Sequence, residues 1–164
     1  MSELVARASD PQAQLQDALD LSYRYLGHRD RTVAEVRERL GAEGIEEAVV
    51  DEAVEELRHL GYLDDARYAQ RFAEDWRTID AWGAERIERR LLAVGVDPQL
   101  IEAALGEQGA GEELEAALAV LRRRFAQPPA HDRDRDRALG LLVRKGYELE
   151  LAYDAVRAFE RDAA

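Results

Sequence analysis

The side chains that most often carry covalent or acid–base chemistry are few in this sequence. Cysteine is absent. The hydroxyl and imidazole candidates are three serines and three histidines: Ser2, Ser9, Ser22, His28, His59 and His131. No pairing among them has the logic of a nucleophile with its base, and the His-Glu-x-x-His pattern of a zinc helix is missing. We therefore expect no enzyme activity, no catalytic or metal-binding residue and no cofactor.

Acidic pairs and a glycine-rich segment have simple explanations. Glu46-Glu47, Glu55-Glu56 and Asp64-Asp65 fall at expected helix starts or exposed faces, where carboxylates cap helices or meet water. The segment Gly106–Gly111 places its glycines in the wrong order for a dinucleotide loop and follows no strand, so it predicts a linker. The alternating charges of Asp132–Arg137 are interpreted as a solubilising loop and helix entry.

Arginine is the side chain that remains for binding. The chain has 23 Lys and Arg residues, and all but Lys145 are arginine, whose planar fork suits carboxylates and phosphates. The candidate partner-binding residues are Arg77, Arg86, Arg89, Arg90, Arg122, Arg123, Arg124, Arg144 and Lys145. The alternative reading is that these cations complement helix dipoles or keep a surface soluble.

The overall charge limits the class of partner. The formal net charge is −12, which argues against a protein that coats DNA phosphates. Residues 1–63 carry −7, residues 64–110 carry −4 and residues 111–164 carry −1, so an anionic partner is expected at the second half. No apolar run approaches the roughly 18–20 residues of a membrane span, and the first residues lack signal-peptide features. We expect a cytoplasmic protein.

Apolar residues recur every three or four positions along the chain, which predicts an all-α fold. A start at Asp10-Pro11 and a capping box at Thr32 and Glu35 mark two of the expected helices. Two predicted inward helix faces lie on either side of residues 61–67. They are formed by Val50, Val54, Leu57 and Leu60, and by Tyr68, Phe72, Trp76 and Ile79.

Between these two faces lies the segment Gly61-Tyr62-Leu63-Asp64-Asp65. Gly61 tolerates the left-handed backbone of a helix end, and Asp64 or Asp65 can cap the next helix. We expect Tyr62 and Leu63 to pack this connection. The segment is predicted to be the joint between two repeated units.

An internal repeat organises the whole chain. The helix stops Gly44, Gly95 and Gly146 are separated by 51 residues each. Residues that can cap a helix recur with the same spacing at Thr32, Gly83 and Asp134, as do apolar residues elsewhere in the unit. The period predicts three tandem three-helix repeats that form an elongated, curved array. The predicted boundaries are a flexible tail at 1–12 and repeats at 13–63, 64–109 and 110–164.

The segment Leu60–Ala69, with Phe72, Arg77 and the pattern Gly83-x-x-Arg86-Ile87-x-x-x-Leu91-x-x-x-Gly95-Val96, resembles the RecX family of recombination regulators. The resemblance extends over about residues 13–160. It implies tandem three-helix repeats, in agreement with the 51-residue period. It also implies a non-enzymatic regulator, acting as a monomer in DNA repair, recombination and the SOS response. The implied partner is the RecA recombinase and its single-stranded DNA filament, whose ATP hydrolysis, extension and strand exchange are restrained.

Two other functions fit a chain of short helices. One is a tandem helix-turn-helix-like DNA-binding protein, although the acidic third helix of the first repeat opposes it. The other is a helical-repeat scaffold for a different protein client, since repeats describe a shape and not a partner. We expect weak or no independent DNA binding and no membrane contact.

Overall fold

Helix starts follow from residues that satisfy the free backbone groups of a first turn. In the computed structural model, which describes residues 10–162, Asp10 accepts a hydrogen bond from Gln12 N and precedes Pro11, the first residue of α2. Thr32 forms a reciprocal capping box with Glu35 at the start of α3. Both predicted caps are confirmed. Residues 1–9 of the predicted tail lie outside the described residues, and residues 11 and 12 belong to α2.

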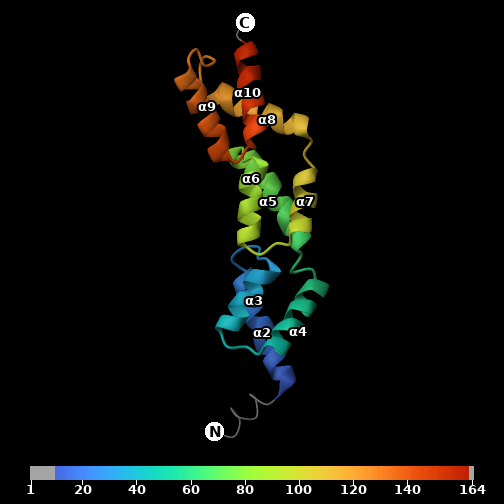
Figure 1. The fold of residues 1–164 in the computed structure, drawn as a ribbon. Coiled ribbons are helices and arrows are strands. Elements are labelled where there is room, and N and C mark those ends of the chain that lie inside the picture. Colours follow the sequence, from blue (N-terminus) through green and yellow to red (C-terminus); the bar gives the residue numbers. More distant parts are fainter. Residues whose placement is uncertain (1–9, 163–164) are drawn as a thin grey trace. The chain divides into compact units, whose positions relative to one another are not determined.

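The part of the chain that the structure describes contains nine helices and no strand (Figure 1). The helices are α2 (Pro11–Leu26), α3 (Val33–Ala42), α4 (Glu47–His59), α5 (Asp65–Asp80), α6 (Ala84–Ala93), α7 (Pro98–Gly106), α8 (Ala110–Arg124), α9 (Asp132–Lys145) and α10 (Leu149–Arg161). The predicted all-α class is confirmed, while the elongated, curved arrangement stays a prediction. None of these nine helices combines the length and the apolar character needed to cross a membrane.

The helices divide between two units. In unit 1, which includes residues 10–68 and 93–97, α2, α3 and α4 pack on one another. Their core contains the fully buried side chains of Val36, Leu40 and Leu57, and Leu63 adds to it from the connection before α5. Apolar residues at spacings of three and four therefore build this core as predicted.

Unit 2, which includes residues 69–92 and 98–162, has its main core between α8, α9 and α10. Leu121, Leu142 and Tyr147 are almost completely buried there. At the corner between α5 and α6, the rings of Trp76 and Trp82 stack with centroids 4.2 Å apart.

The three helix stops that define the repeat share one backbone conformation. Gly44, Gly95 and Gly146 have φ values of +77°, +79° and +95°, in the left-handed region that favours glycine. The repeated three-helix organisation is thereby visible in the backbone as well as in the sequence.

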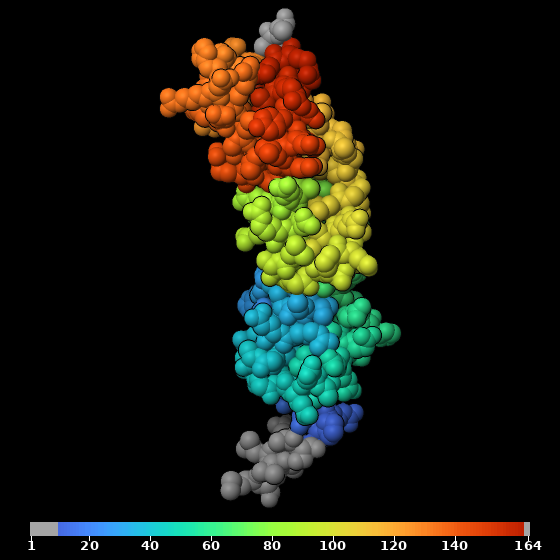
Figure 2. All heavy atoms as spheres, in the orientation of Figure 1, coloured from blue at the N-terminus to red at the C-terminus, as the bar shows by residue number. Residues whose placement is uncertain are grey.

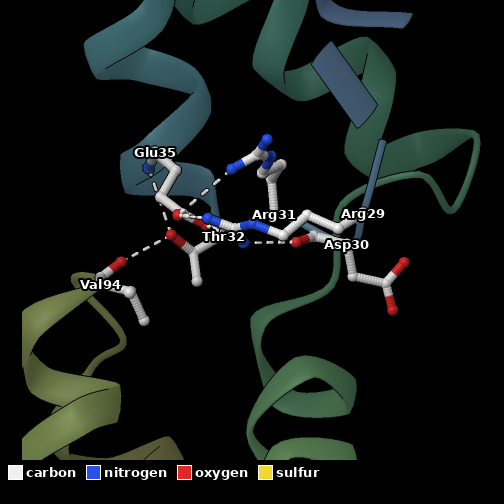
Figure 3. A network of polar contacts seen from close by, with 6 residues as sticks. All are labelled: Arg29, Asp30, Arg31, Thr32, Glu35 and Val94. Carbon is white, nitrogen blue, oxygen red and sulfur yellow. Dashed lines mark hydrogen bonds and ion pairs between the residues drawn. The ribbon is translucent and has the colours of Figure 1, made fainter. Parts of the chain in front are cut away.

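One contact recurs with the same 51-residue spacing, once in each unit. In unit 1, Thr32 Oγ1 donates a hydrogen bond to the carbonyl of Val94 at 2.6 Å (Figure 3). In unit 2, the equivalent Gly83 donates from its backbone N–H to the carbonyl of Lys145 at 2.9 Å. In both places a helix start lies against a turn that ends in a left-handed glycine. We call this pair of contacts the helix–turn contact.

The predicted joint has a more specific structure than expected. Leu63 is buried in the core of unit 1, whereas Tyr62 is 54% exposed and meets Tyr23 edge to face. Asp64 caps α5 by accepting from Arg67 N at 3.0 Å. Asp65 reaches back to α3, where its Oδ1 accepts from Val33 N at 2.9 Å. The two aspartates therefore cap two different helices, and partial burial raises the pKa of Asp65.

Two residues predicted to face inward are exposed. Ile79 is 71% exposed because α5 buries the small side chains of Ala69 and Ala73 instead. Ile79 follows Ala73 by six residues, which turns it about 120° away from that face. Leu60 is 50% exposed because α4 ends at His59, and the chain has already left the helical register.

Two helix starts also differ from the prediction. Helix α9 begins at Asp132, so Asp134 is its third residue and not a cap. Two carboxylates in this first turn suit the helix dipole, and ion pairs to Arg135 and Arg137 stabilise it. Helix α8 begins at Ala110, so the predicted linker Gly106–Gly111 shortens to residues 107–109.

The helix–turn contact predicts unequal costs for matched glycine substitutions. In Gly95→Ala the new Cβ would lie 2.4 Å from Ala34 Cβ, whereas in Gly44→Ala it would meet nothing within 4 Å. Both variants carry the left-handed strain of about 1 kcal/mol, and G95A adds the steric cost of overpacking, about 1–3 kcal/mol. Denaturant unfolding followed by circular dichroism should rank G95A clearly below G44A. Equal losses would contradict the assigned contact.

Candidate partner-binding surface

Helix α6 presents two of the predicted arginines to solvent. Arg89 and Arg90 are exposed, and Arg89 lies on the opposite side of the helix from the buried Ile87 and Leu91. Arg86 is different, because its guanidinium lies 4.0 Å from the centre of the Trp82 ring, where it makes a cation–π contact. This helix therefore offers two accessible cations beside one that is held by a ring.

Arg77 lies against the end of α7. Its Nη2 donates to the carbonyl of Leu105 at 3.1 Å, and its Nε is buried without a hydrogen-bond partner among the described residues. Burial lowers the pKa of Arg77, against the opposing effect of Glu113, Glu107 and Glu112. The same carbonyl, at the end of α7, also accepts from Gln108 N at 3.3 Å, so Arg77 adds a second donor within the fold.

The three arginines that end α8 point in different directions. Arg122 pairs with Asp162 and lies 3.9 Å from Glu115, and the hydrogen bond that it donates to Asp162 raises its pKa. Arg123 and Arg124 instead line hollows on the other side of α8. Consecutive helical residues are turned by about 100°, which separates Arg122 from its two neighbours.

Lys145 ties the end of α9 to the corner after α5. Its Nζ donates to the Asp80 carboxylate at 2.6 Å and to the Asp80 carbonyl at 2.7 Å. The hydrogen bond from Lys145, followed by one from Trp82, lowers the pKa of Asp80. The lysine is therefore largely engaged within unit 2.

Two hollows bring the remaining cations together. One, of about 500 Å³, is lined by Arg124, Phe125, Arg133, Asp136, Arg137, Leu141 and Arg144. A second, of about 210 Å³, is lined by Ile79, Asp80, Ala81, Val120, Arg123, Arg124, Leu141 and Lys145. They share Arg124 and Leu141, so we describe them together as the basic groove. The groove lies within unit 2, on α8, α9 and the corner after α5.

The sequence prediction missed Arg133 and Arg137 as members of this surface. Both were interpreted as part of a solubilising loop and helix entry, because acids and arginines alternate along Asp132–Arg137. Their helical spacing carries the missing signal: Arg133, Arg137, Leu141 and Arg144 fall at intervals of four, four and three residues, which is one face of a helix.

A second polar cluster surrounds the start of α3 (Figure 3). Glu35 accepts from Thr32 N at 3.0 Å and pairs with Arg29, while Arg31 lies at 3.9 Å. Partial burial alone would raise the pKa of Glu35, but the hydrogen bonds from Arg29 and Thr32 outweigh it and hold the pKa below its ordinary value. These contacts fix the capping box that makes the helix–turn contact in unit 1.

Comparisons with known proteins agree with the repeated three-helix organisation. Residues 18–57 match the family model described as RecX, first three-helix domain, and residues 64–105 match RecX, second three-helix domain. The regulatory protein RecX of Trichlorobacter lovleyi is 37% identical over 142 residues, covering 84% of this chain and 92% of that protein. This chain belongs to the RecX family.

Other RecX proteins extend the comparison. The regulatory protein RecX of Thermus thermophilus is 33% identical over 146 residues, covering 89% of this chain and 94% of the relative. The crystal structure of RecX from Lactobacillus salivarius superposes with a TM-score of 0.80 at 19% identity, covering 90% of this chain and 97% of that one. This likeness agrees with the fold assigned from the sequence.

Some RecX relatives are much longer than the matching region. The RecX of Lactobacillus delbrueckii subsp. bulgaricus is 43% identical over 90 residues, which cover 55% of this chain and 33% of that relative. The chain thus matches about a third of the length of this curated relative.

The contact between Lys145 and Asp80 predicts a stability difference that depends on pH. Lys145→Gln should lower the free energy of unfolding by about 1 kcal/mol at neutral pH, as expected for one partly exposed ion pair. Because the folded-state pKa of Asp80 is lowered, the pair stabilises fully above roughly pH 4 and is lost as the pH falls through the lower folded value.

The stability deficit of K145Q in denaturant unfolding should therefore shrink as the pH falls below about 4, leaving only the contribution of the bond to the Asp80 carbonyl. The matched control is Arg58→Gln, which removes an exposed pair with Glu55 at 3.7 Å and should cost only a few tenths of a kcal/mol. A K145Q deficit that is constant down to low pH would contradict the role of the Asp80 carboxylate.

Proposed function

We propose that this protein binds the RecA recombinase on its single-stranded DNA filament and restrains ATP hydrolysis, filament extension and strand exchange. The observation that carries the proposal is the match of residues 18–57 and 64–105 to the two RecX three-helix domains. The protein would act as a cytoplasmic monomer in DNA repair, recombination and SOS regulation. It would need no cofactor and perform no catalysis of its own.

The accessible cations support an acidic or phosphate-bearing partner. Arg89 and Arg90 are exposed on α6, and Arg123 and Arg124 are exposed at the end of α8. Guanidinium groups form bidentate pairs with carboxylates and phosphates, and several modest contacts made by linked domains act together. Three of the predicted binding residues, Arg77, Arg122 and Lys145, already have partners within unit 2, so we assign the main contribution to the others.

The charges of α4 disfavour a helix-turn-helix-like DNA reader. Asp51, Glu52, Glu55 and Glu56 are all exposed on this helix. A helix that enters a DNA groove needs cations or neutral donors at the phosphates, and four carboxylates would be repelled. The net charge of −12 likewise limits affinity for free DNA at physiological salt.

A titration of RecA ATPase activity tests the proposal directly. Steady-state ATP hydrolysis by RecA on single-stranded DNA is expected to fall as this protein is added in amounts below those of RecA. If ATP hydrolysis is unchanged up to an equimolar amount, a helical-repeat scaffold for a different protein client becomes the better hypothesis.

A pair of double variants tests the contribution of α6. Arg89→Ala with Arg90→Ala should raise the half-inhibitory concentration about tenfold, which corresponds to about 1.4 kcal/mol of binding free energy. The control removes the same charge from α3 by Arg37→Ala with Arg39→Ala, whose side chains pair with Asp51 and Glu43. If both double variants weaken inhibition equally, the effect is one of net charge and α6 is not the contact.

A further inference from the structure

The basic groove has a stripe of arginines as one wall. Arg133, Arg137 and Arg144 line the larger hollow along α9, while Ala138 and Leu142 on the opposite face are buried in the core. From Arg133 to Arg144 the helix rises by about 16 Å at roughly 1.5 Å per residue. Figure 2 shows the atoms of α9, in orange, at the surface beside those of α10, in red.

The charges of this stripe are poorly compensated within the described residues. Arg124, Arg133 and Arg144 form no ion pair within 4.0 Å there, and Arg137 has one, to Asp134 at 3.7 Å. Many other arginines of the protein do pair with its own carboxylates: Arg29, Arg31, Arg37, Arg39, Arg58, Arg122, Arg135 and Arg157. Clustered like charges on a concave surface raise the local concentration of anions.

Helix dipoles explain part of this cluster and leave the rest unexplained. Arg124 and Arg144 lie in the last turns of α8 and α9, where a cation is favourable. Arg133 is the second residue of α9, where the positive end of the helix disfavours it. The helix dipole therefore does not explain the position of Arg133.

The shape and walls of the groove indicate what kind of anion fits. The larger hollow, about 500 Å³, continues into the smaller one past Arg124 and Leu141, so the cavity suits a chain more than a compact ion. The partly buried ring of Phe125 and the side chain of Leu141 lie among the guanidinium groups. Cations along a groove with an aromatic surface are the features that bind single-stranded nucleic acid.

We propose that the basic groove binds the phosphate backbone of single-stranded nucleic acid, with Arg124, Arg133, Arg137 and Arg144 on phosphates and a base against Phe125 and Leu141. This goes beyond the proposed regulatory function because it requires no recombinase. The acidic remainder of the chain keeps the affinity modest and strongly dependent on salt.

Fluorescence anisotropy of a labelled oligothymidylate of about 12 nucleotides tests the groove in the absence of RecA. Binding is expected at about 0.05 M salt and should weaken steeply by about 0.2 M, with a log–log slope near −3 for about four phosphate contacts. Arg133→Gln with Arg144→Gln should lower the affinity about tenfold and make the slope shallower.

Two further variants separate the loss of groove contacts from effects of net charge and of folding. Arg122→Gln with Arg157→Gln removes the same charge outside the groove, from side chains paired with Asp162 and Asp154, and should retain most of the affinity. Asp136→Asn removes the one carboxylate that lines the larger hollow and should tighten binding about threefold. Circular dichroism checks that each variant keeps its helices.

Several outcomes would overturn the proposal. Absence of binding at the lower salt concentration would do so, as would equal losses in the two double variants. Equal competition by a polyglutamate peptide of the same charge would make the groove a carboxylate site for an acidic protein segment. Duplex DNA that binds as tightly as the single strand would show that the groove does not select a strand. None of these results depends on inhibition of RecA, so the two proposals fail separately.

Discussion

The helix–turn contact is the constraint on which much of this structure depends. A helix start at Thr32 or Gly83 hydrogen-bonds to the turn at Val94 or Lys145, and the approach is too close for a side chain on the glycine that follows. A Cβ at Gly95 or Gly146 would lie 2.4 Å from Ala34 Cβ or 2.2 Å from Arg86 Cβ. The left-handed backbone and the lack of space therefore require the same residue. In unit 2 this contact also places Arg86 and Lys145 beside the corner that carries Asp80 and Trp82.

The repeat could be predicted from the sequence because its period is set by backbone geometry. A left-handed helix stop favours glycine wherever it occurs, so Gly44, Gly95 and Gly146 stand out at equal spacing. The caps at Asp10 and Thr32 follow from short-range hydrogen bonding in the same way. The exposure of Ile79 could not be predicted, because the spacing of large apolar residues gives little weight to alanine. The face that α5 buries consists of Ala69 and Ala73. Packing against a neighbour decides such a face, not local spacing.

The binding surface was only partly predictable for a different reason. Arginine clusters at the ends of α8 and α9 are visible in the sequence, but three consecutive arginines cannot all point the same way. The structure directs Arg122 to Asp162 and directs Arg123 and Arg124 to the basic groove. Arg77 looked like a surface cation and instead meets a helix-end carbonyl. The partners of these side chains are distant in sequence, and a single sequence does not specify them.

The stacked indoles at the corner between α5 and α6 have a practical consequence for spectroscopy. The protein contains two tryptophans, and Trp76 and Trp82 lie with ring centroids 4.2 Å apart and planes tilted by 15°. Both indoles therefore emit from the same corner of the fold, and the guanidinium of Arg86 lies over the Trp82 ring. Intrinsic tryptophan fluorescence therefore reports on this corner of unit 2, while events confined to the cores of α2–α4 leave the emission unchanged. The ring contact between Tyr23 and Tyr62 lies within unit 1, outside the region that the tryptophans report.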